Sequence, residues 1–311
     1  MLDCNSIKYT SLIICYFAVT MIFPHYDLHT HTTASDGVLS PSALFTSALE
    51  NELKILAVTD HDTIEGCSEL LALQRSGEIS DEIKLISGAE LTCVLDRQIL
   101  HVVALGIQID NPALTEHMLM LQALRLERAE RIAEKLVKKK LPDILSLVHE
   151  KAAGAQIGRP HFAKVLCDLK LVSSEAQAFK KYLGAGKVAN VSVQWPTLEQ
   201  VLKVIKQSGG VSVLAHPTKY KLTMSKLRRI IAEFKLLGGD AIEFSYPGVN
   251  VQQQNILKFE IDKHQLLVSA GSDFHTPENK WTTLGRYPKV ADDLPHVLTK
   301  CLADKVPVKR I

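Results

Sequence analysis

The chain has 311 residues, of which 46% are hydrophobic and 23% are charged, and its formal net charge is +2. This mixture is too apolar for a disordered protein and too evenly charged for an integral membrane protein. The length suits about two domains or one large α/β unit. Six scattered cysteines include no CxxC pair, which argues against a disulfide framework and a thiolate zinc site. The unusual count is 12 histidines.

Near the N-terminus, residues 11–23 form an uncharged, largely apolar run. The run is shorter than the ~20 residues that a membrane-spanning helix needs. No small-x-small cleavage site follows it before Asp27, so a signal peptide is disfavoured too. We interpret residues 1–20 as an N-terminal extension, either not translated in the native protein or disordered. We therefore expect Met21 to start a cytoplasmic protein without a membrane segment.

Strand-like and helical patterns alternate over residues 21–110 and again after residue 190. The predicted strands are residues 21–29, 54–60, 83–95, 100–108, 211–217, 240–248 and 266–275. The predicted helices are residues 41–53, 64–77, 197–210, 225–239 and 251–265. Ser40 is the expected N-cap of the first helix, and Gly77 ends the second. This alternation is typical of a parallel α/β sheet or barrel.

Strand signals are almost absent between the two alternating stretches, where charged helical patterns prevail. Residues 117–190 contain 14 Lys and Arg against 7 Asp and Glu, whereas the rest of the chain has 22 against 27. We predict a barrel over 21–110 and 190–290, a helical insertion domain over 111–189 and a C-terminal tail over 291–311. A basic insertion suits a polyanionic substrate, although a solvated helix face explains the charges of residues 125–140 equally well.

Five segments place histidines or acidic residues at or beside the ends of predicted strands. They are His29 and His31 with Asp36; Asp60, His61 and Asp62; Glu90, followed by His101; His216; and Asp273 with His275. Residues two apart on a strand point to the same side, so His29 and His31 can reach one metal ion. A lone histidine on an apolar strand is more often a hydrogen-bonded core residue. Five such segments at the end where barrels build active sites predict a metal centre.

Four other histidines lie outside these five segments. His117, His149, His264 and His296 lie in helical or C-terminal segments. We expect these four at the surface, and we assign no role to His25.

The motifs HTH, TDHD, GAE, AHP and GSDFH, in this order, resemble those of the PHP (polymerase and histidinol phosphatase) family of metal-dependent phosphoesterases. The resemblance covers residues 21–289 and implies an α/β fold, a distorted (β/α)7 barrel of PHP type with a helical insertion domain. It also implies two or three divalent ions. One would be held by His29, His31, Glu90 and Asp273, a second by Asp36, His61 and His275, and a third by Glu90, His101 and His216. We expect manganese, with zinc and iron as alternatives, because Asp36 replaces the histidine of some relatives with a hard oxygen ligand.

Three further segments, GRPHFA (158–163), YLGAGK (182–187) and AHPTKYK (215–221), resemble a subgroup of this family. The subgroup includes 3′,5′-nucleoside bisphosphate phosphatases and a 5′-to-3′ exoribonuclease acting on 5′-monophosphorylated RNA. The resemblance implies a nucleotide or an RNA 5′ end as substrate, and we expect no obligate protein partner. The expected ligands of a second phosphate are Arg159, His161, Lys187 and Lys219. Relatives often have Arg at the position of Lys219, and Lys lacks its bidentate geometry.

Several alternatives stay open at this point. Asp27, Asp60 and Asp62 either orient the histidines or cap loop turns. The chain could instead be a PHP phosphatase for another small monoester such as histidinol phosphate, which the subgroup motifs disfavour. It could also be a non-catalytic nucleic-acid-binding module with a degenerate metal site, which the complete set of ligands disfavours. No residue is assigned as general acid.

Overall fold

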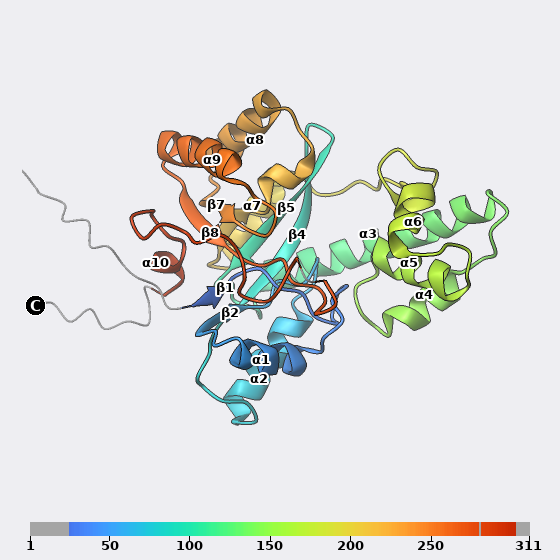
Figure 1. The fold of residues 1–311 in the computed structure, drawn as a ribbon, viewed down its shortest axis with the longest axis horizontal. Coiled ribbons are helices and arrows are strands. Elements are labelled where there is room, and N and C mark those ends of the chain that lie inside the picture. Colours follow the sequence, from blue (N-terminus) through green and yellow to red (C-terminus); the bar gives the residue numbers. More distant parts are fainter. Residues whose placement is uncertain (1–24, 280, 303–311) are drawn as a thin grey trace, which may run out of the picture.

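The computed structural model describes residues 25–279 and 281–302. The predicted extension over 1–20 and the end of the C-terminal tail lie outside these residues. The described strands form two sheets, and helices pack around them (Figure 1). No helix in the described part of the chain is long and apolar enough to cross a bilayer.

The first sheet has three short parallel strands: β1 (Tyr26–Asp27), β2 (Ile55–Ala57) and β3 (Lys84–Ile86). The helices α1 (Pro41–Glu50) and α2 (Glu65–Ser76) connect them and lie together below the sheet in Figure 1. Ser40 caps α1 by accepting the N–H of Ala43. Gly77 ends α2 in the left-handed region, at a φ of 79°. Both caps are confirmed.

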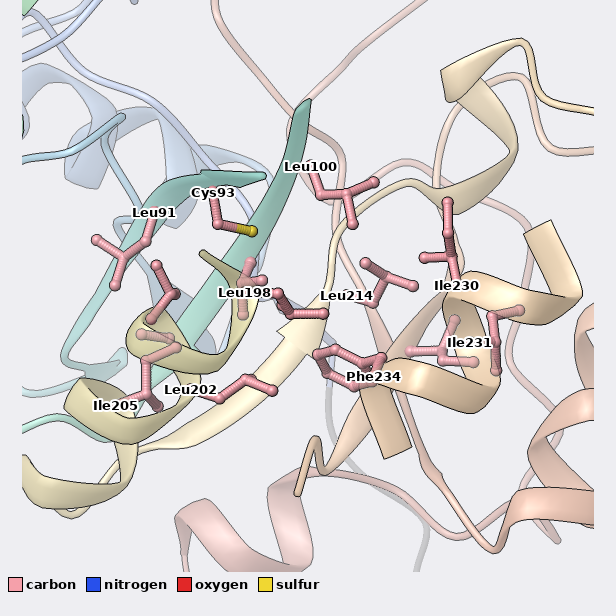
Figure 2. Packing of buried hydrophobic residues seen from close by; sticks show 14 of the residues in the cluster. Leu91, Cys93, Leu100, Leu198, Leu202, Ile205, Leu214, Ile230, Ile231 and Phe234 are labelled. Carbon is pink, nitrogen blue, oxygen red and sulfur yellow. The ribbon is translucent and has the colours of Figure 1, made fainter. Parts of the chain in front are cut away.

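The second sheet has five strands in chain order: β4 (Gly88–Leu95), β5 (Gln98–Leu105), β6 (Val211–Leu214), β7 (Ala241–Ser245) and β8 (Leu267–Ala270). The β4–β5 and β5–β6 pairs are antiparallel, and the remaining pairs are parallel. The helices between and after these strands are α7 (Leu198–Gln207), η2 (Pro217–Tyr220), α8 (Met224–Leu236), α9 (Val251–His264) and α10 (Leu298–Cys301). Figure 2 shows Leu202 of α7 and Phe234 of α8 in the same core as Leu214 of β6.

The described strands form two separate sheets and no closed barrel, so the predicted distorted (β/α)7 barrel is not confirmed. The segment 83–95, predicted as one strand, divides at Ser87 into β3 and β4, which belong to different sheets. At this break the Ser87 hydroxyl donates to the main-chain oxygen of Ile107 at 2.6 Å. The strands of the first sheet are only two or three residues long because polar loops begin where a barrel strand would continue. Isolated bridges, Thr30–Phe274 and His61–Glu90, link the two sheets.

The long helix α3 (Pro112–Val137) leaves the sheets and carries the smaller helices of the insertion (Figure 1). These are α4 (Leu145–Ala152), α5 (Arg159–Asp168), α6 (Glu175–Ala178) and the π-helical turn η1 (Phe179–Leu183). The first half of α3 packs into the main core through residues such as Leu121, and its second half packs into a separate core through residues such as Leu136. This second core extends to Val191, so the boundaries at 111 and 189 stay a prediction.

Two of the histidines expected at the surface are buried. His117 is 7% exposed because it lies on the face of α3 that packs against the main core, and His296 is 4% exposed. The Nε2 atom of His296 lies 2.7 Å from the Tyr26 hydroxyl, and its Nδ1 accepts the N–H of Leu298. His149 is exposed as expected, and His264 is half-buried 3.4 Å from Glu260.

Candidate metal centre

The nine predicted ligands come from both sheets and converge where the two sheets meet. His29 and His31 follow β1, Asp36 lies in the next loop, His61 follows β2, Glu90 and His101 lie in β4 and β5, His216 follows β6, and Asp273 and His275 follow β8. Their donor atoms form overlapping groups within 4.8 Å: His31, Asp36, His61 and His275; His29, His31 and Asp273; His29, Glu90 and His216; and His61, Glu90 and His101. In this geometry His101 and His216 share Glu90 but fall in different groups. The division of ligands among individual ions therefore stays a prediction.

Glu90 is at the middle of the cluster and is fully buried. One carboxylate oxygen, Oε2, lies 2.8 Å from His61 Nδ1 and 3.4 Å from His29 Nε2. The other, Oε1, lies 3.0 Å from His101 Nδ1 and 3.1 Å from His216 Nε2. A single carboxylate placed among imidazoles in this way is suited to bridge two ions.

Several buried polar atoms of the cluster lack a hydrogen-bond partner. They include both ring nitrogens of His31, Nε2 of His29, Nδ1 of His216 and Oε2 of Glu90. Buried polar groups are nearly always hydrogen-bonded unless they bind an ion or a water molecule. The donors are imidazole nitrogens and carboxylate oxygens without thiolates, a set that suits manganese, iron or zinc. The residues present therefore fit divalent metal ions.

Burial and neighbouring charges shift the pKa values of the side chains in the cluster. Burial, with repulsion from His275 and His61, lowers the pKa of His31 to about 3 and keeps this ring neutral, which is the form that binds metals. Burial alone would raise the pKa of Glu90, but the imidazoles around it hold that pKa well below its usual range. Burial would lower the pKa of His275, but the Asp36 carboxylate raises it to about 9. Metal binding would therefore displace a proton from His275.

A cavity of about 150 Å³ opens beside the cluster. On one side it is lined by the predicted ligands Asp36, His61 and His101. On the other side the insertion contributes three arginines, Arg125, Arg128 and Arg159, together with Phe179, and Trp195 adds a second ring. The cavity therefore joins a cluster of predicted metal ligands to a strongly cationic wall.

Comparison with known proteins places this site in a family. The model of the PHP domain matches residues 27–235. The chain belongs to the PHP family. It is 40% identical to the 5′-3′ exoribonuclease Rnm of Escherichia coli over 84% of this chain and 88% of that protein. It is 32% identical to the 3′,5′-nucleoside bisphosphate phosphatase of Chromobacterium violaceum, over 87% of this chain and 93% of that protein.

A solved structure supports the same relationship. The structure of an amidohydrolase from Chromobacterium violaceum, with bound sulfate and no metal, superimposes with a TM-score of 0.80. It is 30% identical in sequence, and the match covers 90% of this chain and 96% of that one. The PHP-type α/β fold, with its mixed sheets, is therefore shared beyond the sequence motifs.

In this PHP domain, Glu243 of β7 is a site residue that the sequence interpretation missed. Its Oε1 lies 2.9 Å from His29 Nδ1, which leaves Nε2 of that ring facing the cluster. Its Oε2 accepts the main-chain N–H of His216 at 2.6 Å. The signal that identified Glu90, an acid inside an apolar strand, is also present in the segment AIEFS. Glu243 orients two predicted ligands through one buried carboxylate.

Of the two interpretations of Asp27, Asp60 and Asp62, the one in which they orient the histidine rings finds no support in the side-chain hydrogen bonds of the described residues. Asp27 accepts the main-chain N–H groups of His29, Ser272 and Gly285; Asp60 accepts from Thr32 and Ser35; and Asp62 accepts from Thr92 and Arg125. Main-chain amides and hydroxyls reach these carboxylates because the loops fold tightly around them. The alternative interpretation, in which these acids organise loops, fits Asp27 and Asp60, whereas Asp62 pairs with Arg125 of α3 and Thr92 of β4.

The four predicted phosphate ligands do not share one pocket. Arg159 lines the cavity, whereas Lys187 is exposed and does not line it. His161 is buried and uses Nδ1 to accept the N–H of Gly158, which fits the start of α5. Lys219 Nζ lies 2.8 Å from Asp273 Oδ2, on the cluster itself. Close contacts thus occupy the side chains of His161 and Lys219, and of the four residues only Arg159 lines the cavity.

Backbone strain at two predicted ligands supports a functional role for the site. His216 has a φ of 29° and Asp273 a φ of 52°, both in a region that residues other than glycine rarely adopt. Each such conformation costs about 1–3 kcal/mol and persists where the surrounding structure enforces it.

Proposed function

We propose that this chain is a metal-dependent phosphoesterase that hydrolyses phosphate esters of nucleotides. Its substrates are 3′,5′-nucleoside bisphosphates, RNA with a 5′-monophosphate, or both. The observation that carries the proposal is a cluster of nine predicted ligands that opens into an arginine-lined cavity. The names of the relatives from Escherichia coli and Chromobacterium violaceum support the same substrate classes.

The two sides of the cavity have different tasks in this proposal: the predicted metal ligands serve the reaction, and the arginines serve substrate binding. Bound divalent ions, for which manganese is our first candidate, would supply charge stabilisation to the phosphoryl group and activate water. The carboxylates of Asp36, Glu90 and Asp273 and the six histidines hold those ions, and Glu243 orients His29. The cationic wall binds the part of the substrate that the ions do not reach.

The same wall weighs against histidinol phosphate as substrate. That molecule carries an amine in place of a second phosphate, and the cavity presents three arginines to it. Like charges in a desolvated cavity repel one another strongly. A nucleotide with a second phosphate is the better electrostatic match.

The test is a manganese-supplemented assay with adenosine 3′,5′-bisphosphate and with a 5′-monophosphorylated RNA oligomer. We expect phosphate release or stepwise removal of nucleotides, and we expect Asp273→Asn and Glu90→Gln to abolish it. Glu260→Gln is the matched control because Glu260 is fully buried in α9, outside the cluster. Full activity of Glu90→Gln would contradict the proposal. Steep loss of RNA turnover as salt rises, without similar loss for the bisphosphate, would identify binding through several phosphates.

A further inference from the structure

Trp281 is the most exposed large hydrophobic side chain in the described part of the chain, at 86%. Single exposed apolar side chains are common on protein surfaces, but tryptophan is usually well covered because its ring is so large. The Trp281 ring also borders a cavity of about 450 Å³, here named the Trp281 cavity, together with Pro247, Tyr287 and Pro288. The exposed indole is therefore one wall of a concave surface.

The Trp281 cavity also presents a cation that no protein group neutralises. Arg286 lines this cavity and is exposed, and its side chain forms no hydrogen bond or ion pair with the rest of the described chain. No described aspartate or glutamate lines the cavity. An aromatic face beside free guanidinium donors is suited to single-stranded nucleic acid, because the ring stacks on a base and the cation contacts the backbone.

Trp281 lies on the loop that carries two of the predicted metal ligands, Asp273 and His275. It follows His275 by six residues, a length that spans at most about 20 Å when fully extended. The loop is folded more tightly than that. Asn279 accepts the N–H of Trp281 on Oδ1 and the N–H of Thr282 on its main-chain oxygen, both at 3.1 Å. The main chain at Trp281 is therefore less than about 20 Å from that of His275.

A second set of contacts joins the Trp281 cavity to the metal cluster. Pro247 of the cavity directly follows Tyr246, at the end of β7. The Tyr246 ring lies 5.4 Å from Lys219 Nζ, and that atom lies 2.8 Å from Asp273 Oδ2. The Trp281 cavity is thus next to β7 and β8, whereas residues of β4 and β5 line the cavity with the three arginines. The two cavities are separate sites that both adjoin the cluster.

On these grounds, and resting on the proposed function, we propose that Trp281 and Arg286 form a stacking site for the RNA strand on the 3′ side of the scissile phosphate. Trp281 stacks on a base, and Arg286 contacts a phosphate of the strand. A 3′,5′-nucleoside bisphosphate has no nucleotide beyond the phosphate that is cleaved, so it leaves this site empty. The stacking site therefore adds affinity for RNA alone. It does so with little dependence on sequence, because every base has a π-face.

The test compares a 5′-monophosphorylated RNA oligomer with adenosine 3′,5′-bisphosphate in manganese-supplemented assays. Trp281→Ala should raise KM for the RNA by about 5- to 150-fold, the usual effect of losing one base–aromatic stack. Its KM for the bisphosphate should stay within about twofold of wild type. Trp281→Phe should recover part of the loss because it keeps an aromatic face. Arg286→Met should raise KM for the RNA and make its salt dependence shallower, because one phosphate contact is lost.

Phe259→Ala is the matched control. Phe259 is also an exposed aromatic residue, at 61%, but it lies on α9 and does not line the Trp281 cavity. Its removal should leave KM for both substrates unchanged. An unchanged KM for RNA in Trp281→Ala, or an equal rise in KM for both substrates, would overturn the stacking site.

A fluorescence measurement separates failure of the stacking site from failure of the proposed function. The chain has two tryptophans, and the other one, Trp195, is 4% exposed. Titration with a phosphorothioate RNA oligomer, which resists hydrolysis, should quench the emission of wild type by a larger fraction than that of Trp281→Phe. If wild type hydrolyses neither substrate yet shows this difference, the stacking site stands and the proposed reaction fails. Equal fractional quenching in the two proteins, or none in wild type, would overturn the stacking site.

Discussion

The guanidinium of Arg125 and the carboxylate of Asp62 form an ion pair in which Asp62 is fully buried and Arg125 is 8% exposed. Arg125 is on α3, between the residues that pack into the main core and those that pack into the second core. Asp62 follows β2 and also accepts the N–H and hydroxyl of Thr92 in β4. The pair thus joins the insertion to both sheets beside the metal cluster.

Removing one member of the Arg125–Asp62 pair should lower the free energy of unfolding substantially. Arg125→Met leaves the Asp62 carboxylate buried without its cation, so we expect the free energy of unfolding to fall by about 3–5 kcal/mol. Arg131→Met removes only a solvent-exposed pair with Glu127 and should cost at most about 1 kcal/mol. Urea unfolding of the two variants measures the difference. A similar loss of unfolding free energy in Arg125→Met and Arg131→Met would show that the Arg125–Asp62 pair is not what anchors α3.

Glu243 should control metal affinity without being a ligand. In Glu243→Gln the amide NH₂ group cannot accept a hydrogen bond, so the variant can no longer satisfy both His29 Nδ1 and the N–H of His216. We expect manganese affinity to fall by about 10- to 100-fold, as for other groups that orient metal ligands. Calorimetric titration with Mn²⁺ measures this. Asp240→Asn, at the other end of β7, contacts Ser212 and Lys300 and should bind manganese like wild type. Unchanged affinity in Glu243→Gln would refute the orienting role.

Gly271 should tolerate no side chain. A Cβ at this position would lie 2.4 Å from the Cβ and 2.6 Å from the main-chain N of His29. We expect Gly271→Ala to displace His29, to lower stability by about 1–3 kcal/mol and to reduce the bound manganese, measured by elemental analysis. At Gly238 a Cβ would meet nothing within 4 Å, although the φ of 94° is unfavourable for alanine. Gly238→Ala should therefore lose stability but keep its metal, and equal metal content in both variants would contradict the prediction.

His296 should make the protein sensitive to mild acid. Burial lowers its pKa from about 6.5 to about 4 in the folded state, so below pH 6.5 the unfolded chain takes up a proton that the folded protein excludes. Its contribution to stability is complete above pH 6.5 and is lost as pH falls toward 4, on the order of 3 kcal/mol in total. Urea unfolding at several pH values should show a flatter profile for His296→Asn than for wild type. The exposed control His149→Asn should follow wild type, and an unchanged profile in His296→Asn would exclude this contribution.

Most of the candidate ligands could be predicted from sequence because they stand where an apolar strand gives way to polar residues, whereas Glu90 and His101 lie inside strands. His61 and His216 are examples, and a fold that gathers strand ends must bring them together. The signal that identified Glu90, an acid inside an apolar strand, would also have selected Glu243. Asp62 shows the limit of the rule, because its partner Arg125 is far away in sequence and only tertiary structure pairs them.

Other features could not be predicted because they depend on packing. The strand predicted over 83–95 reads as one apolar run, and its division between two sheets is visible only in the hydrogen bonds around Ser87. Burial of His296 depends on a contact with Tyr26, near the other end of the chain. Arg128 lies over the ring of Trp195, a residue that no helical periodicity connects to it. The local sequence pattern predicts a helix or strand and the polar residues at its end. It does not predict which residues from distant parts of the chain contact that element.

The helix α3 belongs to two hydrophobic cores, and this has a consequence for folding cooperativity. Its 26 residues run from one core to the other as one uninterrupted helix. Melting of either core would fray a helix on which the other core packs, because helical hydrogen bonds propagate along the chain. The two parts of the molecule should therefore unfold in a single transition, and the spacing between metal cluster and arginine wall should persist until the whole protein melts.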